Sequence, residues 1–318
     1  MEIPSRNLAL ELVRVTETAA IAASKWIGRG AKNDADHAAV EAMRRMISTV
    51  QMRGTVVIGE GEKDDAPMLY NGEAVGDGTG PECDVAVDPI DGTTLTAKGA
   101  NNAISVIALA SRGSMLNISD AFYMLKLAVG PEAAAVIDIR ESITENLKRI
   151  AKAKHKSVDE LTVVMIDRPR HDKFAEEIRA AGARIKFIQD GDVAGSIMAA
   201  RPGTGVDLLY GIGGTPEGVI SACAMQCLGG EIQGKLAPQS EGEKTQAIAA
   251  GLDLNQIYTS KDLVKSDYIF LAATGITPGE LLEGIRFGEH RIHSQSIVMR
   301  SRTNTVRIIS TEHLRSKS

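Results

Sequence analysis

Hydrophobic residues recur along the chain at two spacings, which predict helices and strands. Residues 7–27 are expected to form an amphipathic helix, and a second helix is expected from about residue 36 to residue 50. The run 102–110 is almost continuously apolar, which is typical of a strand buried on both faces. The apolar positions that carry the first helix recur at helical spacing and are Leu8, Leu12, Val15 and Ala19.

The second half of the chain alternates between apolar strand patterns and helical patterns. A charged, helical stretch at 141–160 is expected to connect two parts of the molecule, with a solvated face. The alternation that follows predicts an α/β (α+β layered) fold with helices covering a sheet. We expect two stacked subdomains, residues 1–150 and 151–318, with the C-terminal strands packed on either part.

Composition narrows the class of protein. The 318 residues include 36 Lys and Arg against 41 Asp and Glu, a formal net charge of −5, so a nucleic-acid or anionic-membrane partner is not expected. No apolar run approaches the roughly 18–20 residues of a membrane span. Three cysteines give no disulfide framework, and the N-terminus lacks a signal-peptide pattern, so a cytoplasmic location is expected.

The stretch DVAVDPIDGTT, residues 84–94, carries the most chemistry. A strand is expected to end at Asp88, and Pro89 suits the first position of a turn or helix. Asp91 follows three residues later, so a helical turn would bring both carboxylates to one side. Two acids beside a helix start suit divalent cations and a phosphate. A strand-to-helix turn with capping acids accounts for this stretch alone equally well.

Further acidic residues stand on separate loops. Each has a simpler role when taken alone, such as an N-cap at Asp36 or a helix-dipole role for Glu217. Together they predict a hard-cation site of oxygen ligands, and no Cys/His spacing favours zinc. Lys32 is a candidate anion contact. The acidic candidates outside DPID are Asp34, Asp36, Glu60, Glu62 and Glu217.

Two segments could hold a substrate. In DRPRHD, an extended Arg-Pro-Arg would place Arg168 and Arg170 on one side, suited to a second phosphate. In QDGDVAG, Asp190 and Asp192 flank Gly191 and could accept hydrogen bonds from sugar hydroxyls. Surface arginines beside a turn, and a turn with an N-cap, account for the two segments about as well.

Taken in order, the motifs resemble those of a known family. DPIDGTT is similar to the signature of the lithium-sensitive, metal-dependent sugar phosphatases. The fuller series resembles the GlpX type of bacterial class II fructose-1,6-bisphosphatase from about residue 6 to residue 315. This series is GRG-K-N-AD, VVIGEGE-D-APMLY, DPIDGTT, DRPRHD, DGDVA, YGIGGTPEGV and ATGIT.

The resemblance implies a sugar-phosphatase fold with the site in the cleft between two subdomains. It implies hydrolysis of fructose 1,6-bisphosphate to fructose 6-phosphate and inorganic phosphate, with Mn²⁺ or Mg²⁺ as cofactor and a homodimer or homotetramer as the assembly. The implied metal ligands are Asp36, Glu60, Asp88, Asp91 and Glu217. The implied substrate-binding residues are Asp91, Gly92, Thr93, Tyr123, Arg168, Pro169, Arg170, Asp190, Gly191, Asp192 and Gly214.

Thr93 and Asp64 are the candidates for orienting or deprotonating the attacking water. Two positions depart from the family pattern: Ala31 stands where many members have Asp, and His37 follows the ligand Asp36. Both departures put the affinity of the first metal site in question.

Three alternatives remain open at this stage. The chain could be a dual enzyme that also accepts sedoheptulose 1,7-bisphosphate, or another phosphatase of the superfamily acting on an inositol phosphate or a nucleotide bisphosphate. It could also be a non-catalytic regulator that binds a sugar phosphate. Retention of every matched ligand together with Thr93 argues against the regulator.

Overall fold

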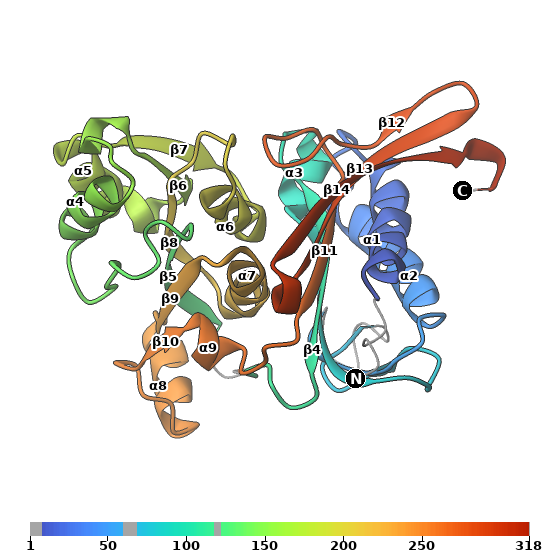
Figure 1. Cartoon of the computed structure of the whole chain (residues 1–318), viewed down its shortest axis with the longest axis horizontal. Helices are drawn as coiled ribbons and strands as arrows, with labels where there is room; N and C mark the ends of the chain where they lie inside the picture. The colour runs from blue at the N-terminus through green and yellow to red at the C-terminus, as the bar shows by residue number, and fades with distance from the viewer. Residues whose placement is uncertain (1–7, 60–68, 118–121, 318) are drawn as a thin grey trace.

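The computed structural model describes residues 8–59, 69–117 and 122–317, in which two β-sheets alternate with three layers of helices (Figure 1). One helix layer covers the outer face of the first sheet, a second lies between the sheets, and a third covers the outer face of the second sheet. These layers contain, in that order, α1 (Ala9–Ser24) and α2 (Lys32–Ile47), α6 (Asp192–Ala200) and α7 (Thr215–Leu228), and α4 (Ile143–Ala153) and α5 (Asp172–Ala180).

The first sheet combines strands from both ends of the chain. Parallel pairing joins β1 (Arg53–Ile58) to β3 (Glu82–Asp91). Antiparallel pairing joins β3 to β4 (Ile104–Ser111), β4 to β11 (Phe270–Gly275) and β11 to β13 (Arg291–Arg300). The long strand β14 (Thr305–Leu314) pairs with β13 at the margin of the sheet. In spatial order the other strands are β12 (Arg286–Phe287), β13 (Arg291–Arg300), β11 (Phe270–Gly275), β4 (Ile104–Ser111), β3 (Glu82–Asp91), β1 (Arg53–Ile58) and β2 (Ala74–Val75).

In the part of the chain that the structure describes, the second sheet has six strands, all from one continuous stretch. Their spatial order is β10 (Ile257–Thr259), β9 (Glu231–Leu236), β5 (Tyr123–Val129), β8 (Leu208–Gly214), β6 (Thr162–Ile166) and β7 (Arg184–Ile188). The other α-helices of the described residues are α3 (Thr93–Lys98), α8 (Glu241–Ala249) and α9 (Ser260–Leu263).

Residue 150 does not separate the strands of the first sheet from those of the second sheet. The strand β5 already belongs to the second sheet, and the chain returns to the first sheet at β11. The C-terminal strands, whose position the sequence left open, therefore pair with the N-terminal ones. A domain boundary near residue 150 stays a prediction.

The strand expected at 102–110 is confirmed as β4, and it is buried on both faces. Val106 packs into the core shared with α7, whereas its neighbour Ile107 packs into the core under α1. All of β4 except Ser111 is buried. Because both faces are covered, the apolar pattern is continuous and not alternating.

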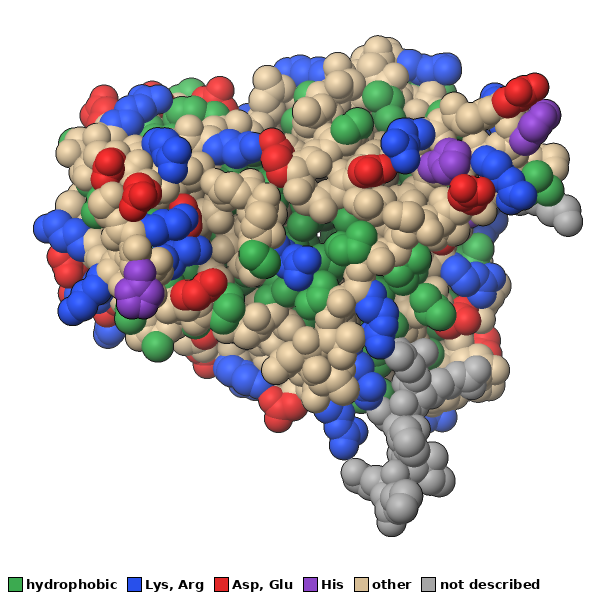
Figure 2. Space-filling model, turned by 45° about the horizontal axis from the view of Figure 1, so that its top comes forward, with side chains coloured by type: hydrophobic (Ala, Val, Ile, Leu, Met, Phe, Trp, Pro, Cys, Tyr) green, Lys and Arg blue, Asp and Glu red, His purple; other side chains and the backbone are tan. Residues whose placement is uncertain are grey.

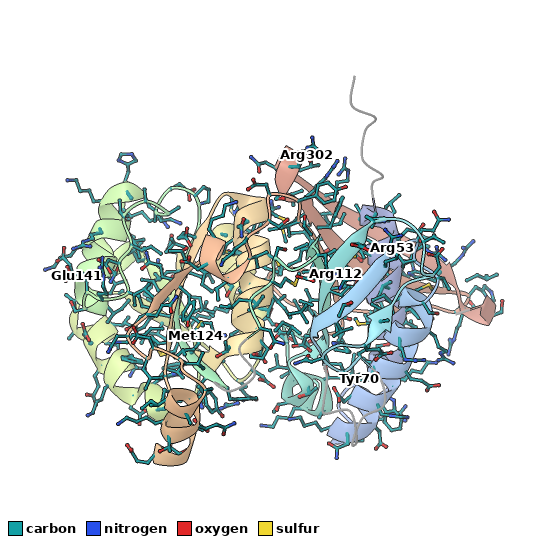
Figure 3. The ribbon with its side chains drawn as sticks, turned by 90° about the horizontal axis from the view of Figure 1, so that it is seen from below. Arg53, Tyr70, Arg112, Met124, Glu141 and Arg302 are labelled. Carbon is teal, nitrogen blue, oxygen red and sulfur yellow. The ribbon has the colours of Figure 1, made fainter. Side chains whose placement is uncertain are left out.

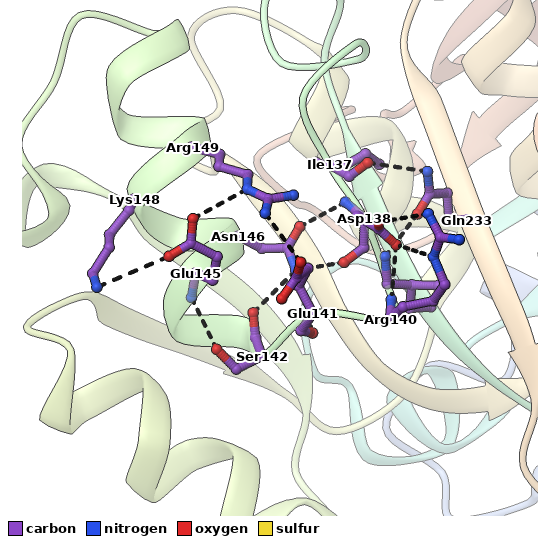
Figure 4. Close-up of polar contacts among 11 residues, drawn as sticks. Ile137, Asp138, Arg140, Glu141, Ser142, Glu145, Asn146, Lys148, Arg149 and Gln233 are labelled. Atoms are coloured by element: carbon purple, nitrogen blue, oxygen red, sulfur yellow. Dashed lines mark hydrogen bonds and ion pairs between the residues drawn. The ribbon is translucent and has the colours of Figure 1, made fainter.

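The segment 141–160 is more than a solvated connector. Its helix α4 buries Leu147 and Ile150 against the second sheet, and only its other face carries charge. Ser142 caps the helix by accepting a hydrogen bond from the Glu145 amide at 3.1 Å (Figure 4).

Asn146 fastens α4 to the segment that leaves β5 (Figure 4). This side chain is 1% exposed, and its Oδ1 accepts from the Asp138 amide at 2.8 Å. Its Nδ2 donates to the carbonyls of Asp138 at 2.8 Å and Ser142 at 3.0 Å. One buried amide thus hydrogen-bonds to three backbone groups. The carbonyls of Asp138 and Ser142 also accept from the amides of Glu141 and Asn146, whereas the Asp138 amide depends on the Asn146 side chain.

The surface is mixed in charge. On the face drawn in Figure 2, Lys and Arg side chains are interspersed with Asp and Glu, and hydrophobic side chains gather near the middle, between the two halves. At one end of the first sheet Arg112 donates to the Arg53 carbonyl at 2.7 Å, and Figure 3 shows these two side chains side by side. Within the described ranges, every helix is too short or too polar to cross a membrane.

Replacing Asn146 with Ala should lower the free energy of unfolding by about 1–3 kcal/mol, because the truncation removes the hydrogen bonds of a buried side chain and leaves the Asp138 amide without its acceptor. Chemical denaturation at neutral pH measures the difference. Lys148→Ala on the exposed face of the same helix is the matched control and should change stability by no more than about 0.5 kcal/mol. Equal effects in the two variants would contradict a structural role for Asn146.

Candidate functional site

Four of the predicted acidic ligands line one cavity of about 300 Å³ where both sheets and the helix layer between them meet. The cavity walls come from the start of α2, the end of β3, the start of α3, the turn before α6 and the start of α7. The lining residues are Lys32, Asn33, Asp36, Asp88, Ile90, Asp91, Gly92, Thr93, Asp190 and Glu217.

The turn expected at Asp88–Asp91 is not helical, which corrects the sequence interpretation. The strand β3 continues to Asp91, and three residue steps on β3 oppose two on β4, which makes a bulge. Pro89 has no N–H to donate and sits within this irregular stretch. Asp88 Oδ1 accepts from the Ile90 amide at 3.0 Å. The bulge, and not a helix turn, brings both acids to the cavity.

Helix α2 starts earlier than expected, at Lys32, with Ala31 as its N-cap residue. The simpler interpretation of Asp36 as an N-cap is therefore wrong. Asp36 stands one turn inside the helix, four residues after Lys32, so both face the cavity. Burial raises the pKa of Asp36, and the Lys32 ammonium opposes that rise.

Asp91 is the most deeply buried acid of the cavity, and Glu217 is half-buried with one oxygen enclosed. Asp91 Oδ2 accepts from the Ala194 amide at 3.0 Å. Burial raises the pKa of Asp91 well above its ordinary value, and the nearby carboxylate of Asp192 adds to the shift. Burial and Asp192 also raise the pKa of Glu217, whereas Lys126 lowers it. Glu217 Oε2 is buried and has no hydrogen-bond partner among the described residues.

These observations fit a site for divalent cations. Carboxylate oxygens are the ligands that Mg²⁺ and Mn²⁺ take, and the crowded acids need positive charge. In residues 8–59, 69–117 and 122–317, no three Asp, Glu, His or Cys side chains already stand as a ligand group. Ligation by this set would therefore require adjustment of the side chains. Glu60, Glu62 and Asp64 lie outside the described residues.

The turn before α6 joins the cavity from the second sheet. Gly191 has a φ of +82°, a conformation that favours glycine, and lies close enough to Asp91 for an added Cβ to stand 3.5 Å from Oδ2. Asp190 Oδ2 accepts from the Thr94 amide at 3.3 Å, so one amide at the start of α3 is already engaged. Thr93, the first residue of α3, keeps its side chain half-buried at the cavity wall.

Arg170 and Tyr123 form a second group beside the end of β8. The guanidinium carbon of Arg170 lies 5.1 Å from the centre of the Tyr123 ring, and its Nη2 donates to the Ile212 carbonyl at 2.9 Å. Tyr123 pairs with Gly214, which is also the N-cap residue of α7. Ile212, which binds Arg170, stands two residues before Gly214. The second group therefore lies close to the start of the helix that carries Glu217.

The expectation of an extended backbone at Arg168-Pro169-Arg170 is also wrong. Pro169 starts a single 3-10 turn through His171, so Arg168 and Arg170 are not alternate residues of a strand. Arg168 Nη1 donates to the carbonyl of its neighbour Asp167 at 2.8 Å. Arg170 points to the end of β8, where Tyr123 lies.

Sequence reasoning missed Lys126, a fully buried lysine of β5. Its Nζ lies 2.5 Å from Asp192 Oδ2 and donates to the Gly214 carbonyl at 2.8 Å. The signal was present, because one lysine stands inside the apolar strand YMLKLAV. Buried lysines are rare unless they are paired, so an acidic partner could have been expected.

Comparison with known proteins gives a consistent picture. The family model for bacterial, glpX-encoded fructose-1,6-bisphosphatase matches residues 6–313. The chain is 45% identical to a D-fructose 1,6-bisphosphatase class 2/sedoheptulose 1,7-bisphosphatase of Synechocystis sp., over 97% of this chain and 96% of that protein. A protein of the same name from Microcystis aeruginosa is 46% identical over the same shares. The resemblance seen in the motifs is confirmed, and the chain belongs to the GlpX-type family of class II fructose-1,6-bisphosphatases, which are metal-dependent phosphatases.

Proposed function

We propose that this chain hydrolyses the 1-phosphate ester of fructose 1,6-bisphosphate to give fructose 6-phosphate and inorganic phosphate. One observation carries the proposal: in a chain of this family, Asp36, Asp88, Asp91 and Glu217 converge with Thr93 on one cavity. A phosphate release assay with fructose 1,6-bisphosphate, with and without Mn²⁺, tests it directly.

The acids would hold Mn²⁺ or Mg²⁺, with Glu60 as the fifth ligand. Bound divalent ions supply charge neutralisation of the phosphate and activation of a water at neutral pH. Lys32 adds a fixed positive charge at the cavity mouth. Ala31 cannot supply the carboxylate that many members have at this position, so an ion at Asp36 would depend on the remaining acids.

Thr93 would orient the attacking water through its hydroxyl, with Asp64 as its partner in accepting the proton. The Thr93 amide, with Asp91 and Gly92, would face the departing phosphate at the start of α3. Phosphate-ester hydrolysis depends more on positioning and charge stabilisation than on covalent chemistry. Contacts of this kind therefore supply what the reaction needs.

The second group would hold the far end of the substrate. Arg170, which Ile212 and Tyr123 already orient, would present its remaining guanidinium donors to the second phosphate, together with Arg168 and Pro169. Asp190, Gly191, Asp192 and Gly214 would bind the sugar between the two phosphates. Because the relatives' name includes sedoheptulose 1,7-bisphosphatase, the heptulose bisphosphate is proposed as a second substrate. We further propose that the enzyme forms a homodimer or homotetramer in the cytoplasm and that the hydrolysis is a step of gluconeogenesis.

Chelation should abolish turnover, because the converging carboxylates repel one another without divalent cations. Adding Mn²⁺ or Mg²⁺ in excess of the chelator should restore it, and the metal should also raise the melting temperature by binding the folded state. Phosphate release and thermal unfolding measure the two effects. Full activity in excess chelator would contradict the metal requirement.

Thr93→Ala should slow the chemical step by about 10²–10⁴-fold, because it deletes the hydroxyl that orients water and keeps the backbone amide. KM and the Mn²⁺ concentration for half activation should stay close to parental. Thr93→Ser keeps the hydroxyl and should retain much of kcat, whereas Asp91→Ala should also weaken metal activation. A near-parental kcat in Thr93→Ala would leave water activation to the ions and Asp64.

Arg170→Ala should raise KM for fructose 1,6-bisphosphate by the equivalent of up to about 3 kcal/mol, because it removes a charge-assisted contact made before and during the reaction. Arg168→Ala should have a smaller effect. Arg179→Ala, which removes an exposed cation from α5, is the control and should leave KM unchanged. If Arg170→Ala binds the substrate as tightly as the parent, the far phosphate is held elsewhere.

A further inference from the structure

Lys126 lies on the side of β5 that faces the helix layer between the sheets. Its neighbours on that side, Met124 and Ala128, belong to the core shared with α6 and α7. The Lys126 side chain is 0% exposed, and its stem passes close to Gly218 of α7. A lysine so deeply buried needs compensation for the water that it has lost.

Two groups supply that compensation, and both belong to the proposed sugar contacts. Asp192 Oδ2 lies 2.5 Å from Lys126 Nζ, and the Gly214 carbonyl accepts from it at 2.8 Å. Asp192 is 5% exposed and is the first residue of α6, whereas Gly214 precedes the first residue of α7. One ammonium therefore ties together the starts of two helices.

The glycines at the end of β8 make room for this arrangement. A Cβ on Gly213 would lie 1.9 Å from Asp192 Oδ2 and 3.0 Å from Lys126 Nζ. A Cβ on Gly214 would lie 1.9 Å from Glu217 Oε2. The carboxylates of Asp192 and Glu217 thus pack directly against the backbone of these glycines. The Asp192 carboxylate pairs with Lys126, whereas Glu217 Oε2 has no hydrogen-bond partner among the described residues.

We propose that Lys126 is a positioning residue that sets the Asp192 carboxylate for binding the sugar of the bisphosphate. The inference rests on the proposed function. Neither Lys126 nor Asp192 lines the cavity that the acids share, but Asp190, two residues before Asp192 in the same turn, does. Lys126 therefore acts through Asp192 and this turn, and not by touching the reacting phosphate. Without the ammonium, Asp192 would be left as a buried charge among Asp91, Asp190 and Glu217 and would turn away from them.

The test measures KM, kcat and Mn²⁺ activation in Lys126→Met, which keeps the length of the side chain and removes its charge. KM for fructose 1,6-bisphosphate should rise about 10–100-fold, the range seen when an outer partner of a site residue is lost. The kcat should change less than KM. Activation by Mn²⁺ should be no weaker, because one positive charge has left the neighbourhood of the acids.

A second pair of variants shows whether the effect passes through Asp192. Asp192→Ala should raise KM by itself, and Lys126→Met/Asp192→Ala should raise it no further. The double variant also leaves no unpaired buried charge at this pair, so it should melt at a higher temperature than Lys126→Met. It therefore keeps the test valid even where Lys126→Met folds poorly.

The control is Lys235→Met on the adjacent strand β9. Lys235 pairs with Leu125, the neighbour of Lys126, so it lies on the opposite face of the sheet, and its replacement should leave KM parental. A parental KM in Lys126→Met, or KM effects that multiply in the double variant, would overturn the inference. A parent that releases no phosphate from fructose 1,6-bisphosphate with metal present would overturn the proposed function instead.

Discussion

The arrangement of the molecule depends on the burial of negative charge at one place. Asp91, Asp192 and Glu217 come from three different elements, and the Asp192 carboxylate raises the pKa of the other two. Such a cluster persists only if amides and cations are brought to it. The fold does this by ending β3, β7 and β8 around one cavity and starting α3, α6 and α7 there, so that helix starts face carboxylates. Lys126 supplies the buried cation from the middle of β5.

Much of this could be predicted from the sequence, because the pattern of apolar residues is strong where burial is complete. The strand β4 and the helix α1 lie where the pattern of apolar residues placed them. The candidate acids could be identified because several oxygen-rich loops in one chain favour a site for hard cations. Convergence on one cavity followed for Asp36, Asp88, Asp91 and Glu217.

What could not be predicted has specific physical causes. The bulge at Asp88–Asp91 depends on the register with β4, which local spacing does not contain. The direction of the Arg170 side chain could not be predicted, because an Arg-Pro-Arg sequence suits an extended chain as well as it suits the 3-10 turn found at Pro169. Asn146 and Lys126 are polar residues whose partners lie on other segments, so their roles depend on tertiary contacts. The placement of β11 between β4 and β13 is likewise a long-range pairing.

The order of strands has a consequence for how the chain folds during synthesis. All strands of the second sheet lie within residues 123–259, so this sheet can pair fully while the C-terminal region is still inside the ribosome. The first sheet cannot, because β4 gains its second neighbour only when β11 emerges. Until then β4, an almost entirely apolar strand, has an open edge that could pair with another chain. Nascent protein that stalls before residue 270 would therefore be most exposed to aggregation along that strand, and it is there that a chaperone would have most to shield.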